Sequence, residues 1–342
     1  MVERLTLEEA LLKNTRDNWI IVGRHAVWPP KHITIPHRKS FGDDSATTDN
    51  DKQHKHFLSK AIPGYIEGQR PNPQGMIVMG IGGKAQKLLN SRNVIDDQLL
   101  VVKRFSGGGT VVMDENAVWT TLIAGRRGTK EEEEEDQDSI GHKNNILCKP
   151  YPRDIMKWTA EAVFGPAFDV LNANQTMRTT TTHSNNSSND NNSNGDSNRL
   201  PRFSLREDDY VLTFGGDDDN REIRKMGGNA QAITGRQGWL HHTSFLWDYK
   251  DSNMERYLKL PEKRPNYRVD RSHKEFLVKL KEHYANEDGP SAFLEAMKEA
   301  CQESLGLRET DWPSVYQEVF GGSDAEMNAW WLENRTRIQH EL

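Results

Sequence analysis

Three consecutive glycines, Gly107 to Gly109, follow Arg104 and Ser106 in the middle of the chain. Glycine runs lose much conformational entropy on folding, so they are expected where the backbone approaches a ligand closely or needs a positive φ. The amides of such a loop bind anions such as phosphate, and the guanidinium of Arg104 suits a carboxylate or phosphate. A tight turn without a ligand explains the same residues equally well. Neither a Walker loop nor a dinucleotide fingerprint fits, since no Gly-Lys-Ser/Thr follows and a strand is expected next.

A second candidate segment runs from Lys225 through Gly227 and Gly228 to Gln231. A lysine beside paired glycines has an unobstructed path to a buried anion, although an exposed lysine with no ligand is the commoner case. Asp208 and Asp209 precede Lys225 by about one hairpin. Their carboxylates are ligands that Mg²⁺ prefers, although paired carboxylates in a loop usually have no such role.

A third segment contains the adjacent histidines His241 and His242. The segment is apolar enough to be a buried strand, in which neighbouring side chains point to opposite faces. The two rings are therefore not expected to share a metal ion, and the ligand spacings of zinc sites are absent. One of the two is expected to face a ligand. The scattered His25, His32, His37, His54 and His56 lack ligand spacing and are interpreted as surface residues.

Composition narrows the class of protein. The chain has 342 residues, 35% hydrophobic residues and a formal net charge of −6. An acidic balance argues against general nucleic-acid binding, which needs clustered Lys and Arg. Two distant cysteines, Cys148 and Cys301, predict no disulfide framework and a reducing compartment.

No apolar run approaches the roughly 20 residues of a membrane span. Glutamates within the first 12 residues disfavour a leader, so we expect a cytoplasmic protein, or a mitochondrial one if the N-terminus is incomplete.

Hydrophobic periodicity predicts strands in the middle of the chain and helices on either side. The strands are expected at 19–22, 76–79, 99–102, 110–113, 118–124, 203–205, 210–214 and 239–246. We expect 110–113 and 118–124 to form a hairpin with its turn at 114–116. Thr6 and Glu9 are expected to cap a first helix, and Gly165 to end a helix over 152–164. Residues after about 276 are expected to be helical, with Cys301 in the core.

Three polar segments are interpreted as insertions between core elements, near 36–56, 128–145 and 172–199. The last is dominated by Asn, Ser and Thr. Such a composition buries too little apolar surface to order itself. The acidic run within 128–145 is interpreted as a solvated loop.

Taken together, the three chemical segments resemble the catalytic domain of lipoate–protein ligases. The family pattern is Arg-x-Ser-Gly-Gly-Gly, then Lys-x-x-Gly-x-Ala, then His-His. It is matched here by Arg104 with Ser106 to Gly109, by Lys225 with Gly228 and Ala230, and by His241 with His242. The resemblance covers roughly residues 4 to 276 and is strongest to a plant-like eukaryotic branch, through features such as His241 to Tyr249 and Leu258 to Pro261.

This resemblance implies an α+β fold: a mixed, largely antiparallel sheet flanked by helices, as in biotin ligases and class II aminoacyl-tRNA synthetases. It implies a catalytic domain at 1–276 and a helical C-terminal extension at 277–342. The implied enzyme attaches a lipoyl or octanoyl group to a lysine of an apo lipoyl-domain protein, with ATP and Mg²⁺ and through an acyl-adenylate. Nucleic acid and membranes are not expected partners.

Carried onto this sequence, the resemblance assigns Lys225 as the catalytic residue, bridging the acyl carboxylate and the α-phosphate, and Asp209 as the residue that orients Mg²⁺ or Lys225. It places substrate and nucleotide binding at Arg104, Ser106, Gly107, Gly108, Gly109, Thr110, Asp114, Gly227, Gly228, Asn229, Ala230, Gln231, His242 and Thr243.

Departures from the family pattern keep other functions open. Many lipoate ligases have a histidine immediately before the residue that matches Asp114, and Met113 stands there. The accessory domain of bacterial ligases is not recognisable after residue 276. The biotin-type Gly-Arg-Gly-Arg loop is also missing, which favours a lipoyl or octanoyl substrate. A transferase that uses a preformed acyl donor is the nearest alternative, and a non-catalytic acyl or nucleotide sensor is the alternative from another class.

Overall fold

The computed structural model describes thirteen stretches of the chain, the two shortest of which are single residues. They are 2–15, 17–24, 75–114, 117–125, 148–183, 200–215, 221–234, 238–260, 264–284, 290–305, 317, 321 and 335–338. The insertions expected near 36–56 and 128–145, and the five histidines between 25 and 56, lie outside these ranges.

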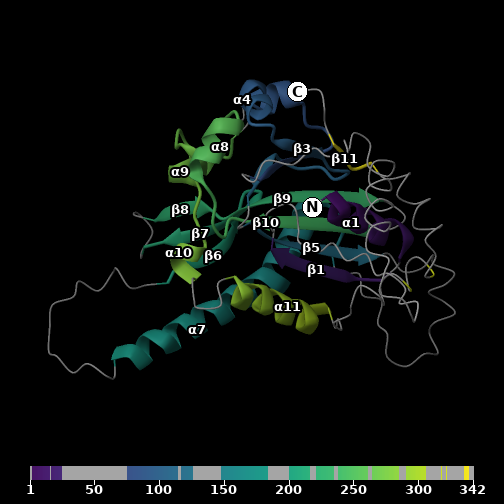
Figure 1. Ribbon diagram of the computed structural model, residues 1–342. Helices are drawn as coiled ribbons and strands as arrows, with labels where there is room; N and C mark the ends of the chain where they lie inside the picture. Colours follow the sequence, from purple (N-terminus) through teal and green to yellow (C-terminus); the bar gives the residue numbers. More distant parts are fainter. Residues whose placement is uncertain are drawn as a thin grey trace, which may run out of the picture.

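The central sheet has four antiparallel strands in the order β1-β5-β10-β9 (Figure 1). They are β1 (Trp19–Arg24), β5 (Val118–Gly125), β10 (Gly238–Phe245) and β9 (Gly227–Thr234). Every residue of β10 is buried, because strands flank it on both sides and other elements cover both faces of the sheet. This explains why the sequence of β10 shows little alternation of apolar and polar residues.

A second sheet has the order β11-β3-β2-β4. Its strands are β11 (Arg337–Ile338), β3 (Leu100–Lys103), β2 (Met76–Met79) and β4 (Val111–Met113). Strands β2 and β3 are parallel, and the short helices α3 (Ala85–Leu88) and α4 (Ser91–Asp96) make the crossover that parallel strands need. The hairpin expected between 110–113 and 118–124 is wrong, since β4 pairs with β2 whereas β5 pairs with β1 and β10.

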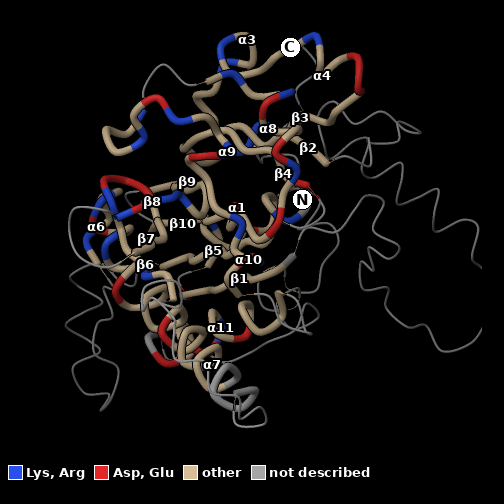
Figure 2. The backbone as a smooth tube through the Cα atoms, turned by 90° about the vertical axis from the view of Figure 1, so that its left-hand side faces the viewer, with Lys and Arg blue, Asp and Glu red and all other residues tan. Residues whose placement is uncertain are grey.

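The third sheet is small and has the order β6-β7-β8. It consists of β6 (Arg202–Arg206), β7 (Asp209–Phe214) and β8 (Glu222–Lys225). Glu207, with φ of 52°, lies in the tight turn between β6 and β7. Acidic and basic residues are interspersed around this sheet (Figure 2). Among them, Lys225 of β8 pairs with Asp209 of β7.

A large aromatic core lies on one face of the central sheet. It is covered by α6 (Pro152–Thr159), a π-helical turn (Ala160–Phe164), α7 (Gly165–His183) and α11 (Ser291–Leu305) (Figure 1). Cys301 is fully buried there, which confirms it as a core residue. Two expectations are wrong. Gly165 does not end the helix but begins α7, and 172–183 of the expected insertion are helical. The apolar face of α7, with Phe168 and Leu171, anchors that helix.

Helix α1 (Val2–Asn14) covers the opposite face of the central sheet, where Leu11 and Leu12 pack with Ile123 and Leu240. Thr6 lies inside this helix, so the capping box expected at Thr6 and Glu9 is wrong. The remaining helices are α8 (Asp251–Tyr257), a 3₁₀ turn (Asn266–Arg268), α9 (His273–Phe276) and α10 (Lys281–Tyr284). None of the helices in the described ranges combines the length and apolarity needed to cross a bilayer.

The architecture is the expected α+β class, with largely antiparallel sheets and flanking helices. The expected C-terminal extension, 277–342, shares the core of the preceding residues. Phe293 and Met297 of α11 join the aromatic core, and β11 pairs with β3.

Candidate functional site

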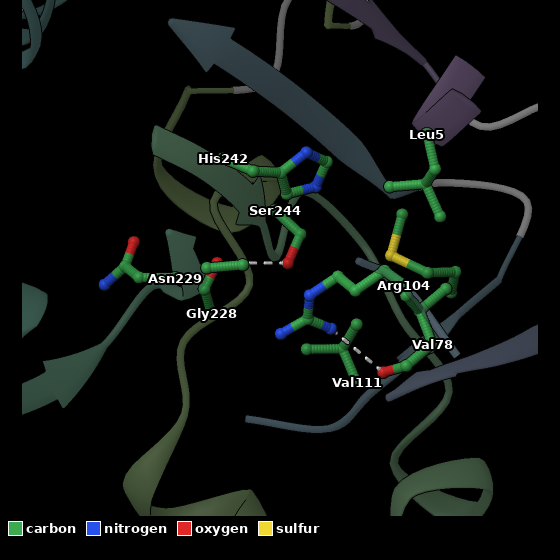
Figure 3. Close-up of a pocket in the computed structure, with 10 residues that line it drawn as sticks. Leu5, Val78, Arg104, Val111, Gly228, Asn229, His242 and Ser244 are labelled. Atoms are coloured by element: carbon green, nitrogen blue, oxygen red, sulfur yellow. Dashed lines mark hydrogen bonds between the residues drawn. The ribbon is translucent and has the colours of Figure 1, made fainter. Parts of the chain in front are cut away.

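A cavity lies between the central sheet, the second sheet and helix α1 (Figure 3). The space within it that a water-sized molecule could occupy is about 10 Å³, room for roughly one water, so the lining side chains nearly fill it. The lining combines apolar side chains with a few polar groups, as ligand pockets do. It consists of Leu5, Val78, Arg104, Val111, Met113, Gly228, Asn229, Ala230, His242 and Ser244.

Strand alternation explains which residues reach this cavity. Ser244 pairs with Gly228, and His242 pairs with Ala230. Directly opposed residues of antiparallel strands share a face, so all four lie on the side of the sheet that α1 covers. Thr243 lies on the other face, where its hydroxyl donates to Asn229 Oδ1 at 3.1 Å. The structure therefore places the predicted residue His242 at the cavity but not its neighbour Thr243.

Arg104 is 3% exposed, and its guanidinium is occupied by the loop that it begins. It donates to Ser106 Oγ at 3.1 Å and to the carbonyls of Gly107 and Gly109 at 3.1 and 2.8 Å. A further contact reaches the Val78 carbonyl at 3.4 Å. Burial lowers the pKa of Arg104 to about 10, against the opposing charge of Glu8. Arg104 thus organises the glycine loop and also lines the cavity, and its expected role of holding phosphate stays a prediction.

The glycine loop packs directly on strand β9. The Gly107 amide donates to the Gln231 carbonyl at 2.8 Å. Gly108 has φ of +110°, and a side chain there would collide with the Asn229 carbonyl and Ala230. Glycine is required at Gly108 for both reasons. The loop and the lysine–glycine segment, more than 100 residues apart, are thereby brought together, as the sequence pattern suggested.

A buried ionic network lies next to His242, which lines the cavity. Thr121 Oγ1 donates to Glu8 Oε1 at 2.7 Å, and His242 Nδ1 lies 2.9 Å from the same hydroxyl and 3.4 Å from Glu8 Oε2. Because the threonine hydrogen goes to Glu8, His242 Nδ1 carries the proton that faces Thr121. Arg4 Nε donates to Glu8 Oε1 at 2.9 Å. Burial alone would raise the pKa of Glu8, but His242, Arg4 and Thr121 outweigh it and lower the pKa to about 2.

Lys225 lies at the end of β8, two residues before β9 begins. Its Nζ donates to Asp209 Oδ1 at 2.5 Å, and the Tyr267 hydroxyl donates to Asp209 Oδ2 at 2.9 Å. The Lys225 side chain is 25% exposed, so it remains accessible while held. Burial and the Asp209 charge raise the pKa of Tyr267 above its ordinary value, which keeps the phenol protonated as a donor. Three extended residues span roughly 10 Å at most, which bounds the backbone distance from Lys225 to Gly228 of the cavity.

His241 points into the aromatic core. Its Nε2 is 2.9 Å from the Tyr210 hydroxyl, and its Nδ1 is 3.1 Å from Gln231 Nε2. Burial, followed by the charge of His242, lowers the pKa of His241 to about 3, so the ring is neutral. Gln231 also donates to the Pro152 carbonyl at 3.1 Å. The predicted site residue Gln231 thus ties β9 to α6 through its side chain.

Three other predicted residues, Asp114, Gly227 and Thr110, do not line the cavity. Asp114 is 4% exposed and accepts the Lys250 amide at 3.0 Å, which fixes the start of α8. Gly227 leaves room for the Ser244 carbonyl. Thr110 lies beside β4, and its buried hydroxyl has no hydrogen-bond partner within the described ranges.

Sequence reasoning missed Glu8, Leu5, Ser244 and Tyr267. Glu8 was interpreted only as a charge that disfavours a leader, although an acidic residue among Leu7, Ala10 and Leu11 lies on a helix face that becomes buried. Ser244 follows His242 by two residues, and the alternation of a strand places both on one face. The signal was therefore present for Ser244, whereas Glu8 and Tyr267 depend on contacts made only in the folded chain.

Within the described ranges, no three His, Cys, Asp or Glu side chains gather in the way that metal ligands do. Both oxygens of Asp209 already accept hydrogen bonds from Lys225 and Tyr267. Asp208 is paired with Arg153 at 3.2 Å on the surface. Of the two roles predicted for Asp209, this geometry favours the orientation of Lys225 over the binding of Mg²⁺.

No family model matches the chain. A curated protein from Plasmodium falciparum (isolate 3D7), named inactive lipoate–protein ligase 2, is 30% identical over 152 residues. The match covers 41% of this chain and 34% of that protein, so the chain spans about a third of the length of this relative.

Among solved structures, the chain is similar to a bipartite lipoate protein ligase from the archaeon Thermoplasma acidophilum, described together with its E2 lipoyl domain. The TM-score is 0.51, with 11% sequence identity over 98% of this chain and 93% of that one. At 11% identity this similarity establishes the fold alone.

Proposed function

We propose, from the relationship of this chain to the lipoate–protein ligase family, that the protein binds a lipoyl or octanoyl group and attaches it to a lysine of an acceptor protein. The observation that carries the proposal is Lys225, held by Asp209 and three residues before Gly228, which lines a largely apolar cavity. A cation near an apolar pocket suits a ligand with a negative head and a hydrocarbon tail.

The side chains that line the cavity have the chemistry of a site for the tail of such a ligand, which would enter by moving them apart. Leu5, Val78, Val111 and Met113 provide apolar surface from three different elements. Gly228 has no side chain, and Val111 packs directly over its backbone beside Ser244, so an acyl chain would have to displace Val111 to lie there. The bottom of the cavity is held rigidly by the network of Glu8 and His242, which limits the entropy lost on binding.

Lys225 would act on the negative charge that develops in each of two steps. First, an oxygen of the fatty-acid carboxylate attacks the α-phosphorus of ATP, and the bond to pyrophosphate breaks. Second, the neutral amine of the acceptor lysine attacks the acyl carbon, AMP leaves with the carboxyl oxygen, and the amine loses a proton. A fixed ammonium stabilises charge on the phosphate and on the carbonyl oxygen in both steps, without a covalent enzyme intermediate.

The residues fit ATP as a substrate better than they fit a protein-bound metal ion. The exposed Gly108 and Gly109 and the Lys225 ammonium supply donors for phosphate, whereas the Gly107 amide is bonded to the Gln231 carbonyl. Mg²⁺ commonly keeps several waters and binds through substrate phosphates and one or two carboxylates. Because Asp209 is engaged by Lys225 and Tyr267, no step is assigned to a metal ion here.

A second candidate function is transfer from a preformed acyl-adenylate, without activation by ATP. Two observations favour it: the Plasmodium relative is named inactive, and most donors of Arg104 are engaged by oxygens of the protein. Under this alternative, Lys225 would serve only the second step.

One experiment separates these candidates. Pure protein is mixed with an apo lipoyl domain and either octanoate with ATP or preformed octanoyl-adenylate, and the mass of the acceptor is measured. Modification with octanoate and ATP supports the ligase. Modification with the adenylate alone supports the transferase. An unmodified acceptor in both mixtures contradicts acyl transfer.

A further inference from the structure

We infer that Trp119, seated over Gly23, sets the inner end of the cavity and so limits the length of the acyl chain that the protein accepts. The inference rests on the proposed function, because it takes the cavity to be the acyl site. Trp119 does not line the cavity itself. It lies immediately behind residues that do.

A row of paired residues crosses the central sheet and leads from the cavity to Trp119. Gly23 pairs with Trp119, Trp119 pairs with Ser244, and Ser244 pairs with Gly228. All four therefore lie on the face that α1 covers. Gly228 is at the end of the row nearest Lys225, and Gly23 is at the opposite end. A chain whose carboxyl group lies near Lys225 would thus extend toward Trp119.

Glycine at position 23 makes space for the indole. A methyl group added there would lie 2.6 and 2.7 Å from two atoms of the Trp119 ring, closer than real contacts allow. The ring therefore occupies the volume that a side chain on β1 would otherwise fill. Nothing larger than glycine fits without moving the ring across the sheet, away from β1.

The indole also contacts His242, which lines the cavity, and Arg4. It stacks on His242 with ring centroids 6.4 Å apart and an interplanar angle of 14°. The Arg4 guanidinium lies over the ring. Leu5, Val78 and Met113 line the cavity and belong to the same apolar cluster as Trp119. Trp119 is 7% exposed, so shortening it would open space that is continuous with the cavity.

Chain-length selectivity tests this inference, and binding is measured so that turnover is not needed. The affinities of hexanoate, octanoate, decanoate and dodecanoate are determined by calorimetry for the wild type, Trp119→Leu and Gly23→Ala. Each additional buried methylene strengthens binding by about fourfold. We expect Trp119→Leu to raise the dodecanoate-to-octanoate affinity ratio by at least about tenfold. Gly23→Ala should shift the preference to shorter chains, because it pushes the ring toward β10.

Trp239→Leu is the matched control. Trp239 is a tryptophan of β10 that is 3% exposed and packs on Trp158 in the aromatic core, on the other face of the sheet. It should leave the chain-length profile unchanged. If Trp119→Leu fails to fold, Trp119→Phe and Gly23→Ala still give opposite expected shifts.

The outcomes test the role of Trp119 separately from the proposed acyl site. If the wild type binds fatty acids and neither the Trp119 variants nor Gly23→Ala change the profile, the role of Trp119 is refuted while the proposed function stands. An equal shift with Trp239→Leu also refutes it, because the effect would then reflect general loosening. If no fatty acid binds the wild type, the proposed acyl site is contradicted and this inference with it.

Discussion

Two cations stand beside glycine-rich segments in this protein, and their surroundings differ. Arg104 is buried, and four carbonyl or hydroxyl oxygens surround its guanidinium. Lys225 has one ionic partner, Asp209, and a side chain that is 25% exposed. Four of the five N–H groups of Arg104 are used in this way, so this cation chiefly holds its own backbone in place, whereas the partly exposed ammonium of Lys225 retains donors for a ligand. The motif places both residues near the site, but the unused hydrogen-bonding capacity distinguishes their roles.

The largest expected effect follows from replacing Lys225. Lys225→Ala removes the only cation assigned to the developing charge, so acyl transfer should fall by about 10²-fold or more. Folding should be preserved, because the side chain is partly exposed. The acceptor mass assay measures the loss, and circular dichroism monitors folding.

Lys281→Ala is a matched control for that prediction. Lys281 also forms a lysine–aspartate pair, with Asp248 at 2.6 Å, and it does not line the cavity. Its replacement should leave turnover within about twofold, because an exposed ion pair contributes little. Near-normal turnover of Lys225→Ala would remove the distinction between the two cations.

Arg104→Gln should affect stability more than a surface substitution does. It leaves the carbonyls of Gly107 and Gly109 without their buried donor, and we expect a loss of about 3 kcal/mol in the free energy of unfolding. Arg104→Lys should not restore it, since an ammonium lacks the planar fork. Urea denaturation measures both, with the exposed Arg153→Gln as control, for which the change should be within about 0.5 kcal/mol. Unchanged stability combined with lost nucleotide binding would return Arg104 to a ligand-binding role.

The sequence alone predicts much of this arrangement. Periodicity locates β1, β5 and β10 of the central sheet but not β9 (Gly227–Thr234), whose glycines and polar residues lack an apolar pattern. The family pattern of glycines, lysine and histidines indicates that three distant segments belong to one place. It does not predict which sheet β4 joins, because the apolar pattern of a strand does not specify its partner. It also does not predict the burial of Glu8, whose stabilisation depends on Thr121 and His242, both more than 100 residues away. The roles of the site residues stay predictions until turnover is measured.

The adjacent histidines extend the comparison to the two faces of one strand. The pKa of buried His241 is lowered to about 3, while an unfolded histidine titrates near about 6.5. Between these values the unfolded chain binds the additional proton, so the free energy of unfolding falls as the pH is lowered. The contribution of His241 is fully present above about pH 6.5. His241→Gln should flatten this dependence near pH 5 by up to about 1.4 kcal/mol per pH unit.

Glu8→Gln provides the contrast in the same measurement. The pKa of Glu8 is lowered to about 2, so its contribution is present above an unfolded pKa of about 4.3 and is lost as the pH falls toward 2. It should therefore change the dependence only below about pH 4.5. Chemical denaturation between pH 3.5 and 7.5 measures both variants. If His241→Gln leaves the slope near pH 5 unchanged, His241 is not the buried neutral group described here.

The smallest expected effect concerns the two thiols, which are the obvious rivals to Lys225 as the group that carries the reaction. Burial, with a further contribution from Asp154, raises the pKa of Cys148 to about 11. Burial raises that of Cys301 to about 12. Both thiols are therefore protonated at neutral pH, and the thiolate is the nucleophilic form. We expect Cys148→Ala and Cys301→Ala to retain acyl transfer within about twofold, since neither lines the cavity. Alanine suits the buried Cys301 because serine would add an unpaired hydroxyl.

The acceptor mass assay is run with octanoate and ATP, and again with octanoyl-adenylate. If Cys148→Ala abolishes transfer from the adenylate while the adenylate still binds, an acyl-thioester intermediate is implied. The acyl group would then pass through Cys148, and the contrast between Arg104 and Lys225 would no longer explain the chemistry.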